Sequence, residues 1–310
     1  MKSTAFITGA TSGIGKATAE IFAKNNIRLI LCGRRADRLE NLQQELGKLT
    51  DVTTLQFDVS KRDEVENAIK SLPENFKRID VLINNAGNAH GLSSIQDGDI
   101  DDWDAMLDIN VKGLLYVSKA IFPQMVARNN GFIVNIGSIA GKEVYPNGNV
   151  YCASKHAVNA LNKAMRVDLN KHNIRVSAIH PGAVETEFSE VRFKGDSEKA
   201  KSVYTGYKAL QAEDIADIIH FVVTRPYHVN IEDLVVYSTA QASPTILNKK
   251  QEKLILNSSN KNDILKLLGS PSTKSTFDQD LWIYIERKTE YSSLIKFKTE
   301  KVVINNVLLL

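Results

Sequence analysis

Residues 5–15 read AFITGATSGIG, an apolar run that passes directly into a turn with three glycines. A helical pattern of apolar residues follows over residues 13–25. A turn without side chains lets the backbone approach a pyrophosphate, and the N-terminus of the following helix favours negative charge. The stretch therefore predicts a strand–turn–helix unit that can bind a dinucleotide. Glycine turns after strands are also common in proteins that bind no nucleotide, so the pattern alone leaves both interpretations open.

The same alternation continues over the first 240 residues. Short β-branched runs, several of them apolar at successive positions, predict strands at 5–8, 28–32, 54–57, 81–84, 132–136, 175–179 and 234–237. Between them lie helical patterns at 13–25, 36–48, 61–71, 101–128, 151–171 and 213–223. Strands that alternate with helices form right-handed crossovers. The predicted fold class is α/β, a Rossmann-type doubly wound parallel sheet of about seven strands, with ligands at the carboxyl ends of the strands.

The composition excludes several classes of protein. Of the 310 residues, 43% are hydrophobic and 24% charged, which is ordinary for a globular protein. The net charge of +3 is too small to indicate a nucleic-acid partner. The two cysteines have no ligand spacing, which favours a reduced compartment without a metal site. No apolar run predicts a membrane span, and the N-terminus does not resemble a signal peptide, so we expect a cytoplasmic protein.

A change of pattern near residue 245 predicts two domains. Residues 245–310 contain 11 Lys/Arg and 7 Asp/Glu, a net charge of +4, whereas the preceding residues contain 28 and 29, a net charge of −1. We therefore assign residues 1–245 to the dinucleotide-binding domain and 246–310 to a small α+β extension. Within the extension the pattern predicts a helix near 261–268 and strands at 281–286, 294–298 and 301–310. The long polar segment 183–212 in the first domain is typical of a lid.

The end of the second predicted strand indicates which dinucleotide is bound. A carboxylate at this place usually binds the ribose 2′-hydroxyl of NAD, whereas arginine accommodates the 2′-phosphate of NADP. Positions 32–36 contain no acidic residue, but they contain Arg34 and Arg35. These residues predict NADP as the cofactor, although two solvated loop charges would look the same. Small or amide residues follow the third and fourth strands, at 58–59 and 84–87, where they can contact adenine and ribose or simply form turns.

Three polar residues form the candidate catalytic set. Tyr151 and Lys155 lie four residues apart and so share one helix face, and Ser138 follows the fifth strand. Tyrosine has an ordinary pKa of about 10, while acid–base catalysis favours a value of about 7. We expect the Lys155 ammonium and the positive nicotinamide ring to lower the pKa of Tyr151, and Ser138 to bind the substrate carbonyl oxygen. A Tyr-x-x-x-Lys pair is also common on exposed helices, but its combination with Ser138 and the glycine turn favours a site.

These motifs together resemble those of the short-chain dehydrogenase/reductase family: TGATSGIG at 8–15, NNAG at 84–87, Ser138, YCASK at 151–155 and Pro-Gly at 181–182. The resemblance covers residues 1 to 245. It implies that Asn110 holds a water that relays protons to Lys155, that the segment after Pro181 contacts the nicotinamide, and that the protein is a homotetramer. The predicted cofactor contacts are Gly9, Thr11, Ser12, Gly13, Ile14, Gly15, Arg34, Arg35, Asp58, Val59, Asn85, Ala86, Gly87, Tyr151, Lys155, Pro181, Gly182, Val184 and Thr186.

A narrower resemblance concerns the lid. FSEVRFKGD at 188–196, with GNVY at 148–151, is similar to the NADP-dependent 3-hydroxy acid dehydrogenases. That resemblance implies oxidation of serine, allo-threonine and other 3-hydroxy acids, or reduction of malonic semialdehyde. Arg192 and Lys194 could pair with a substrate carboxylate, or both could be solvated lid charges. The predicted substrate contacts are Ser138, Tyr151 and Arg192.

The extension resembles another family. DILKLLGSPS at 263–272 and LWIYI at 281–285 are similar to the small outer-membrane lipoprotein of the β-barrel assembly machinery. That family carries a secretory signal and a lipidated cysteine, which this extension lacks, so we interpret the chain as a fusion of neighbouring reading frames.

The predicted function is NADP-dependent hydride transfer to or from a small 3-hydroxy or 3-oxo acid. The alternatives are a 3-oxoacyl carrier-protein reductase, a non-catalytic NADP-binding regulator, and an envelope assembly protein that acts through the extension.

Overall fold

The computed structural model describes residues 2–248, 273–274, 282–294 and 297–309. The chain divides into two units, Met1–Lys249 and Lys250–Leu310. The domain boundary predicted after residue 245 lies four residues before this division. Each unit is described separately below.

The first unit contains one seven-stranded parallel sheet with the strand order β3-β2-β1-β4-β5-β6-β9. Its strands are β1 Thr4–Thr8, β2 Arg28–Gly33, β3 Val52–Gln56, β4 Val81–Asn84, β5 Gly131–Ile136, β6 Ile174–Pro181 and β9 Asp233–Val236. Each of the seven strands predicted in residues 1–245 overlaps one of these, so the predicted doubly wound fold is confirmed. The chain order reverses between β1 and β4, which is where ligands bind in such sheets.

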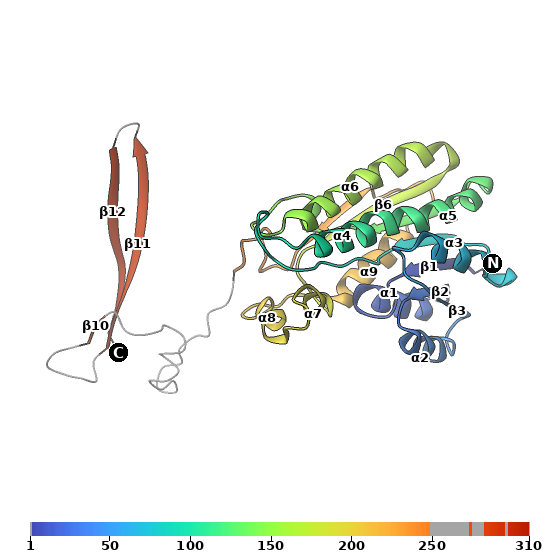
Figure 1. Cartoon of the computed structure of the whole chain (residues 1–310), viewed down its shortest axis with the longest axis horizontal. Helices are drawn as coiled ribbons and strands as arrows, with labels where there is room; N and C mark the ends of the chain where they lie inside the picture. The colour runs from blue at the N-terminus through green and yellow to red at the C-terminus, as the bar shows by residue number, and fades with distance from the viewer. Residues whose placement is uncertain (1, 249–272, 275–281, 295–296, 310) are drawn as a thin grey trace. The chain divides into compact units, whose positions relative to one another are not determined.

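Helices cover both faces of the sheet (Figure 1). On one face lie α1 Gly13–Lys24, α2 Ala36–Leu46 and α9 Ala212–Val223, whose buried residues Phe22, Leu39 and Ile215 belong to one core cluster. On the other face lie α3 Arg62–Lys70, α5 Leu114–Ala127 and α6 Asn149–Leu169, with Val65 and Val158 in a second cluster. Central strands β1, β4 and β5 are buried along their whole length, because apolar side chains on both faces meet a helix layer.

The single helix predicted at 101–128 is divided in the structure. It consists of α4 Ile100–Leu107, a π-helical segment η2 Asp108–Gly113, and α5. A π-turn accommodates one extra residue and often occurs at functional sites. Apolar periodicity does not distinguish it from an α-helix, which is why the sequence predicted continuity. The segment includes Asn110, which is buried.

The predicted lid contains short elements rather than a bare loop. They are β7 Val184–Glu185, α7 Phe188–Arg192, α8 Ser197–Ser202 and β8 Leu210–Gln211, and β7 pairs with β8. Three short 3₁₀ turns complete the first unit: η1 Glu74–Phe76, η3 Ile139–Gly141 and η4 Asn170–His172. Within the part of this unit that the structure describes, no helix has the length and apolar character to cross a bilayer.

The second unit contains an antiparallel sheet with the order β10-β11-β12. Its strands are β10 Thr273–Lys274, β11 Trp282–Leu294 and β12 Phe297–Leu309. The three short runs predicted at 281–310 are therefore two long strands, because β11 and β12 continue through residues where the sequence predicted breaks. The helix predicted near 261–268 lies outside the described residues.

Candidate active site

A cavity of about 330 Å³ lies at the carboxyl ends of β1, β4 and β5, where the chain order reverses. This volume lies within the range of small-molecule sites, about 300–1,000 Å³. The predicted residues that line it are Gly9, Thr11, Ser12, Gly13, Ile14, Arg34, Arg35, Asp58, Val59, Asn85, Ala86, Gly87, Ser138, Tyr151, Lys155, Pro181, Gly182, Val184 and Thr186. Three predicted site residues, Gly15, Asn110 and Arg192, do not line this cavity.

The glycine turn is shaped to leave room above the first helix. Gly9 and Gly13 adopt φ values of +65° and +51°, which side chains rarely allow. A Cβ atom at Gly15 would lie 2.3 Å from the carbonyl oxygen of Gly9, so the third glycine permits close packing of the turn rather than contact with a ligand. The backbone of this turn, bare at the start of α1, fits the pyrophosphate of a dinucleotide.

Asn85 joins this turn to the end of β4. Its Nδ2 atom donates hydrogen bonds to the carbonyl oxygens of Thr8, at 2.9 Å, and Gly9, at 3.1 Å. The hydroxyl of Thr8 in turn accepts the backbone N–H groups of Asn85 and Ala86. The two polar turns that the sequence placed at neighbouring strand ends are therefore one hydrogen-bonded unit.

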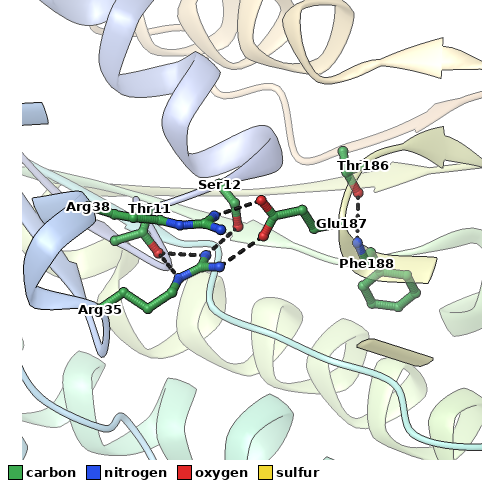
Figure 2. Close-up of polar contacts among 7 residues, drawn as sticks. All are labelled: Thr11, Ser12, Arg35, Arg38, Thr186, Glu187 and Phe188. Atoms are coloured by element: carbon green, nitrogen blue, oxygen red, sulfur yellow. Dashed lines mark hydrogen bonds and ion pairs between the residues drawn. The ribbon is translucent and has the colours of Figure 1, made fainter. Parts of the chain in front are cut away.

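Arg34 and Arg35 have different environments. The side chain of Arg34 is 65% exposed and forms an ion pair with Asp58 at 3.6 Å. Arg35 lies over the glycine turn, where its Nη2 atom donates to the hydroxyls of Thr11 and Ser12, both at 2.8 Å (Figure 2). Both guanidinium groups are therefore placed at the edge of the cavity that the second strand approaches.

A carboxylate from the lid also contacts this arginine. The Glu187 Oε2 atom accepts a hydrogen bond from Nη1 of Arg35 at 2.9 Å, and its Oε1 atom accepts from Nη1 of Arg38 at 2.6 Å (Figure 2). Glu187 lies 152 residues after Arg35 and 149 residues after Arg38 in the sequence. Neither Glu187 nor Arg38 was predicted from the sequence as a site residue.

Ser138, Tyr151 and Lys155 converge at the inner end of the cavity. Ser138 is the N-cap of η3, two residues after the end of β5, while Tyr151 and Lys155 lie on the first turns of α6 with exposures of 8% and 6%. The Ser138 side chain lies close enough to the Tyr151 phenol to affect its pKa. Nζ of Lys155 donates to the carbonyl oxygen of Ile136 at 3.0 Å. The arrangement places two hydroxyls side by side and an ammonium one helical turn away.

The pKa values of this group depend mainly on burial. Burial raises the pKa of Tyr151, and the neighbouring Ser138 hydroxyl and the charge of Arg192 oppose that rise without cancelling it. Burial also lowers the pKa of Lys155 to about 8. The protein's own groups therefore move the phenol pKa in the direction opposite to the one that we expected. The expected lowering in the complex with a positively charged nicotinamide stays a prediction.

Asn110 is hydrogen-bonded to residues beside the cavity. Its Nδ2 atom donates to the carbonyl oxygen of Asn88 at 2.9 Å and to the hydroxyl of Ser154 at 3.0 Å, and its Oδ1 atom accepts the backbone N–H of Asn88 at 2.8 Å. A Cβ atom at Gly87 would lie 3.2 Å from Oδ1 of Asn110 and 3.4 Å from Nζ of Lys155. Gly87 therefore keeps the space between these two groups free of side-chain atoms. The proton-relaying water stays a prediction.

Arg192 and Lys194 of the lid differ in the partners that they contact. The Arg192 guanidinium lies over the rings of Tyr145 and Tyr151, 5.7 and 5.4 Å from their centroids, and its Nη2 donates to the Tyr145 hydroxyl at 3.0 Å. Its Nε is buried and has no hydrogen-bond partner among the described residues. Lys194 forms ion pairs with Asp102 and Asp99 at 2.9 and 3.7 Å. Of the two cations, Arg192 is the one that lies beside Tyr151.

Comparison with known proteins identifies the family. The family model described as short chain dehydrogenase matches residues 3–197. The chain belongs to the short-chain dehydrogenase/reductase family. The model described as the outer membrane protein assembly factor BamE domain matches residues 245–305, in agreement with the resemblance of the extension.

Several relatives of this short-chain dehydrogenase are similar over nearly their whole length. The NADP-dependent 3-hydroxy acid dehydrogenase YdfG of Salmonella typhi is 45% identical over 237 residues, which are 76% of this chain and 95% of the relative. The NADP-dependent 3-hydroxy acid dehydrogenase of Schizosaccharomyces pombe is 43% identical over 251 residues, 80% and 97% of the two chains. Among solved structures, the closed form of serine dehydrogenase complexed with NADP+ is 42% identical, with a TM-score of 0.75 over 77% of this chain and 96% of that one. Serine dehydrogenase from Escherichia coli is 36% identical, with a TM-score of 0.67 over 77% and 99%.

Sequence reasoning missed several residues that line the cavity of this short-chain dehydrogenase. Phe188 lies in the lid with its ring 5.7 Å from that of Tyr151. The further ones are Cys32, Gly33, Phe57, Asn88, Ile109, Ile136, Gly137, Glu187 and Val191. Their positions directly beside predicted residues, at strand ends or after Thr186, were the available signal. None of these residues belongs to a recognisable sequence motif, so only the folded chain shows that they line the cavity.

Proposed function

We propose that this short-chain dehydrogenase is an NADP-dependent oxidoreductase that transfers a hydride between NADP(H) and a small 3-hydroxy or 3-oxo acid. Suitable substrates are serine, allo-threonine and the pair 3-hydroxypropionate and malonic semialdehyde. The observation that carries the proposal is that Ser138, Tyr151 and Lys155 line the same cavity as Arg35. The names of the relatives, which specify NADP and 3-hydroxy acids, support it. A cytoplasmic location and a homotetramer stay predictions.

The cavity has groups for each part of the cofactor. The glycine turn would hold the pyrophosphate, and Arg34 and Arg35 would bind the 2′-phosphate, since guanidinium groups form charge-assisted hydrogen bonds with phosphate. The segment from Pro181 to Thr186 would contact the nicotinamide. When bound, the nicotinamide supplies or accepts the hydride.

The reacting oxygen would lie between the two hydroxyls. Ser138 donates a hydrogen bond to the substrate carbonyl and orients it, while the Tyr151 phenol donates its proton to that oxygen during reduction and removes it during oxidation. The charged Lys155 stabilises the phenolate through space. Lowering the phenol pKa from its ordinary value of about 10 to about 7 requires roughly 4 kcal/mol of preferential stabilisation. Because burial raises the pKa of Tyr151, the requirement is greater in this site and a cation must lie close by. The Asn110 side chain forms two hydrogen bonds with the backbone of Asn88 and thereby fixes the position of this cavity-lining residue.

The acid group of the substrate would be bound by Arg192. This guanidinium lies over the ring of Tyr151, 5.4 Å from its centroid, and is therefore beside the residue that would react with the substrate. Its buried Nε lacks an acceptor among the residues that the structure describes, so a substrate carboxylate would complete its hydrogen bonding. Lys194 is already paired with two aspartates and is assigned no role in binding.

NADP-linked activity on L-serine and on a series of 3-oxo acids tests the proposal. The absorbance of NADPH is followed with the wild-type protein and with Tyr151→Phe, and we expect turnover of the short acids by the wild-type protein alone. A preference for a 3-oxoacyl pantetheine thioester would indicate the carrier-protein reductase instead. Binding of NADP+ without turnover of any carbonyl substrate would indicate a regulator.

A further inference from the structure

Glu187 lies at an unusual place for an acidic residue, inside the cavity and between two arginines. Its two carboxylate oxygens contact Arg35 and Arg38 separately, at 2.9 and 2.6 Å (Figure 2). Burial favours a higher pKa for the carboxyl, but hydrogen bonds from Arg35 and Arg38 outweigh it, and the pKa is lowered. The group is therefore a carboxylate at neutral pH.

A phosphate bound at Arg35 would contact the groups that are hydrogen-bonded to this arginine. Its Nε and Nη2 atoms donate to the hydroxyls of Thr11 and Ser12, and its Nη1 donates to Glu187. Hydroxyls can rotate to donate to a phosphate, whereas a carboxylate has no proton to donate and carries like charge. Among the described residues that Arg35 contacts, Glu187 is thus the one that a 2′-phosphate must displace.

Glu187 also belongs to the segment that reaches the catalytic tyrosine. On its N-terminal side, Thr186 lies against the glycine turn, with its Cγ2 atom 3.2 Å from a Cβ atom built at Gly13. On its C-terminal side, Phe188 lies against the Tyr151 ring. The Phe188 N–H donates to the Thr186 hydroxyl at 3.3 Å, so the three residues form one compact turn. Displacement of Glu187 therefore acts on residues at both ends of the cavity.

We propose that Glu187 lowers the preference for NADP over NAD by competing with the 2′-phosphate of NADP for Arg35. The inference rests on the proposed function, because it requires the 2′-phosphate to bind at Arg35. Binding of NADP exchanges the carboxylate for a phosphate and releases the turn at 186–188, whereas NAD, which has no 2′-phosphate, leaves the ion pairs in place. Breaking the ion pairs costs free energy, which weakens the affinity for NADP but not the affinity for NAD.

Dissociation constants of NADP+ and NAD+, measured by calorimetry, test this without any turnover. The variant is Glu187→Gln, which keeps the shape of the side chain and removes its charge. The matched control is Glu66→Gln, whose carboxylate forms an ion pair with Arg62 on the surface helix α3 and whose side chain is 39% exposed. Because the side chains of Arg35 and Glu187 are 39% and 40% exposed, solvent weakens the pair, and we expect NADP+ to bind about two- to fivefold more tightly to Glu187→Gln. We expect no change for NAD+, and none for either cofactor in the control.

Three results would overturn the inference: unchanged NADP+ binding by Glu187→Gln, weaker binding, or an equal gain for NADP+ and NAD+. Weaker binding would show that Glu187 holds Arg35 in place for the phosphate. If the wild-type protein does not prefer NADP+ over NAD+, the proposed function fails and the inference with it. If the wild-type protein has that preference and Glu187→Gln does not increase it, the inference alone fails.

Discussion

Nζ of Lys155 donates a hydrogen bond to the backbone carbonyl of Ile136, 3.0 Å away. This bond connects the first turns of α6 to the last residue of β5, two residues before Ser138. The Lys155 side chain therefore connects the helix that carries Tyr151 to the strand that precedes Ser138. It is also buried, and burial lowers its pKa to about 8.

The burial of Lys155 predicts an unusual pH dependence of stability. In the unfolded chain the ammonium has its ordinary pKa of about 10.4, so between pH 8 and 10 the unfolded state binds more protons than the folded state. Below pH 8 the burial of the charged ammonium therefore lowers the free energy of unfolding. This destabilisation disappears as the pH rises from 8 to 10. We expect Lys155→Met to be more stable than the wild-type protein at pH 7, by about 1–3 kcal/mol, and to lose that advantage near pH 10. Urea unfolding at both pH values measures it, and equal destabilisation at both would contradict it.

Removal of the Tyr151 hydroxyl should abolish turnover and preserve the fold. We expect Tyr151→Phe to lower kcat by about 10²–10⁴-fold, because the proton donor to the substrate oxygen is lost, with little change in NADP+ binding. Tyr145→Phe is the matched control, since Tyr145 is a neighbouring tyrosine whose hydroxyl binds Arg192. Steady-state kinetics and cofactor titration separate the two effects. A comparable loss of kcat in both variants would argue against a catalytic role of Tyr151.

Loss of the cavity arginines should affect NADPH more than NADH. We expect replacement of both Arg34 and Arg35 by alanine to raise KM for NADPH by about 10- to 100-fold, because charge-assisted contacts to a phosphate are removed. KM for NADH should change little. Arg62→Ala is a suitable control, since Arg62 pairs with Glu66 on the surface helix α3. Equal increases for the two cofactors would show that these arginines shape the turn and do not recognise phosphate.

Substrates with and without a carboxylate should distinguish the role of Arg192. We expect Arg192→Ala to raise KM for a 3-hydroxy acid by about tenfold or more and to spare a neutral ketone, since only the acid gains a charge-assisted hydrogen bond. Lys194→Ala, which removes a cation already paired with Asp102, serves as the control and should leave both substrates unaffected. Losses of the same size on acid and ketone would assign Arg192 to the support of Tyr151.

Removal of the C-terminal unit should leave the dehydrogenase active. The cut is placed after Asn248, so that two contacts of the last described residues of the first unit are kept. The backbone N–H of Asn248 donates to the carbonyl of Ala240 at 2.7 Å, and the Gln241 side chain accepts the N–H of Ala183 beside the cavity at 2.9 Å. We expect the protein truncated after Asn248 to keep wild-type kcat and thermal stability of this unit. A large loss of activity would show that residues beyond 248 contribute to the site.

The correct sequence predictions concern features that neighbouring residues encode. Apolar runs such as residues 81–84 predicted buried parallel strands, and the four-residue spacing of Tyr151 and Lys155 placed both on one helix face. The wrong predictions concern features without a local signal. The π-turn at Asp108–Gly113 has the apolar pattern of an ordinary helix, and β11 and β12 continue through polar residues that read as breaks.

The sequence by itself determined the parallel α/β fold, the glycine turn and the identity of the serine, tyrosine and lysine set, because strand and helix periodicities and turn residues act over a few positions. Only the tertiary structure decided that Glu187 pairs with Arg35 and Arg38, that Arg192 lies over Tyr151, and that Lys155 donates to Ile136. Each of these contacts joins elements that are distant in the chain. Its geometry and its effect on charge depend on how the helices and the lid pack against the sheet, which no local pattern specifies.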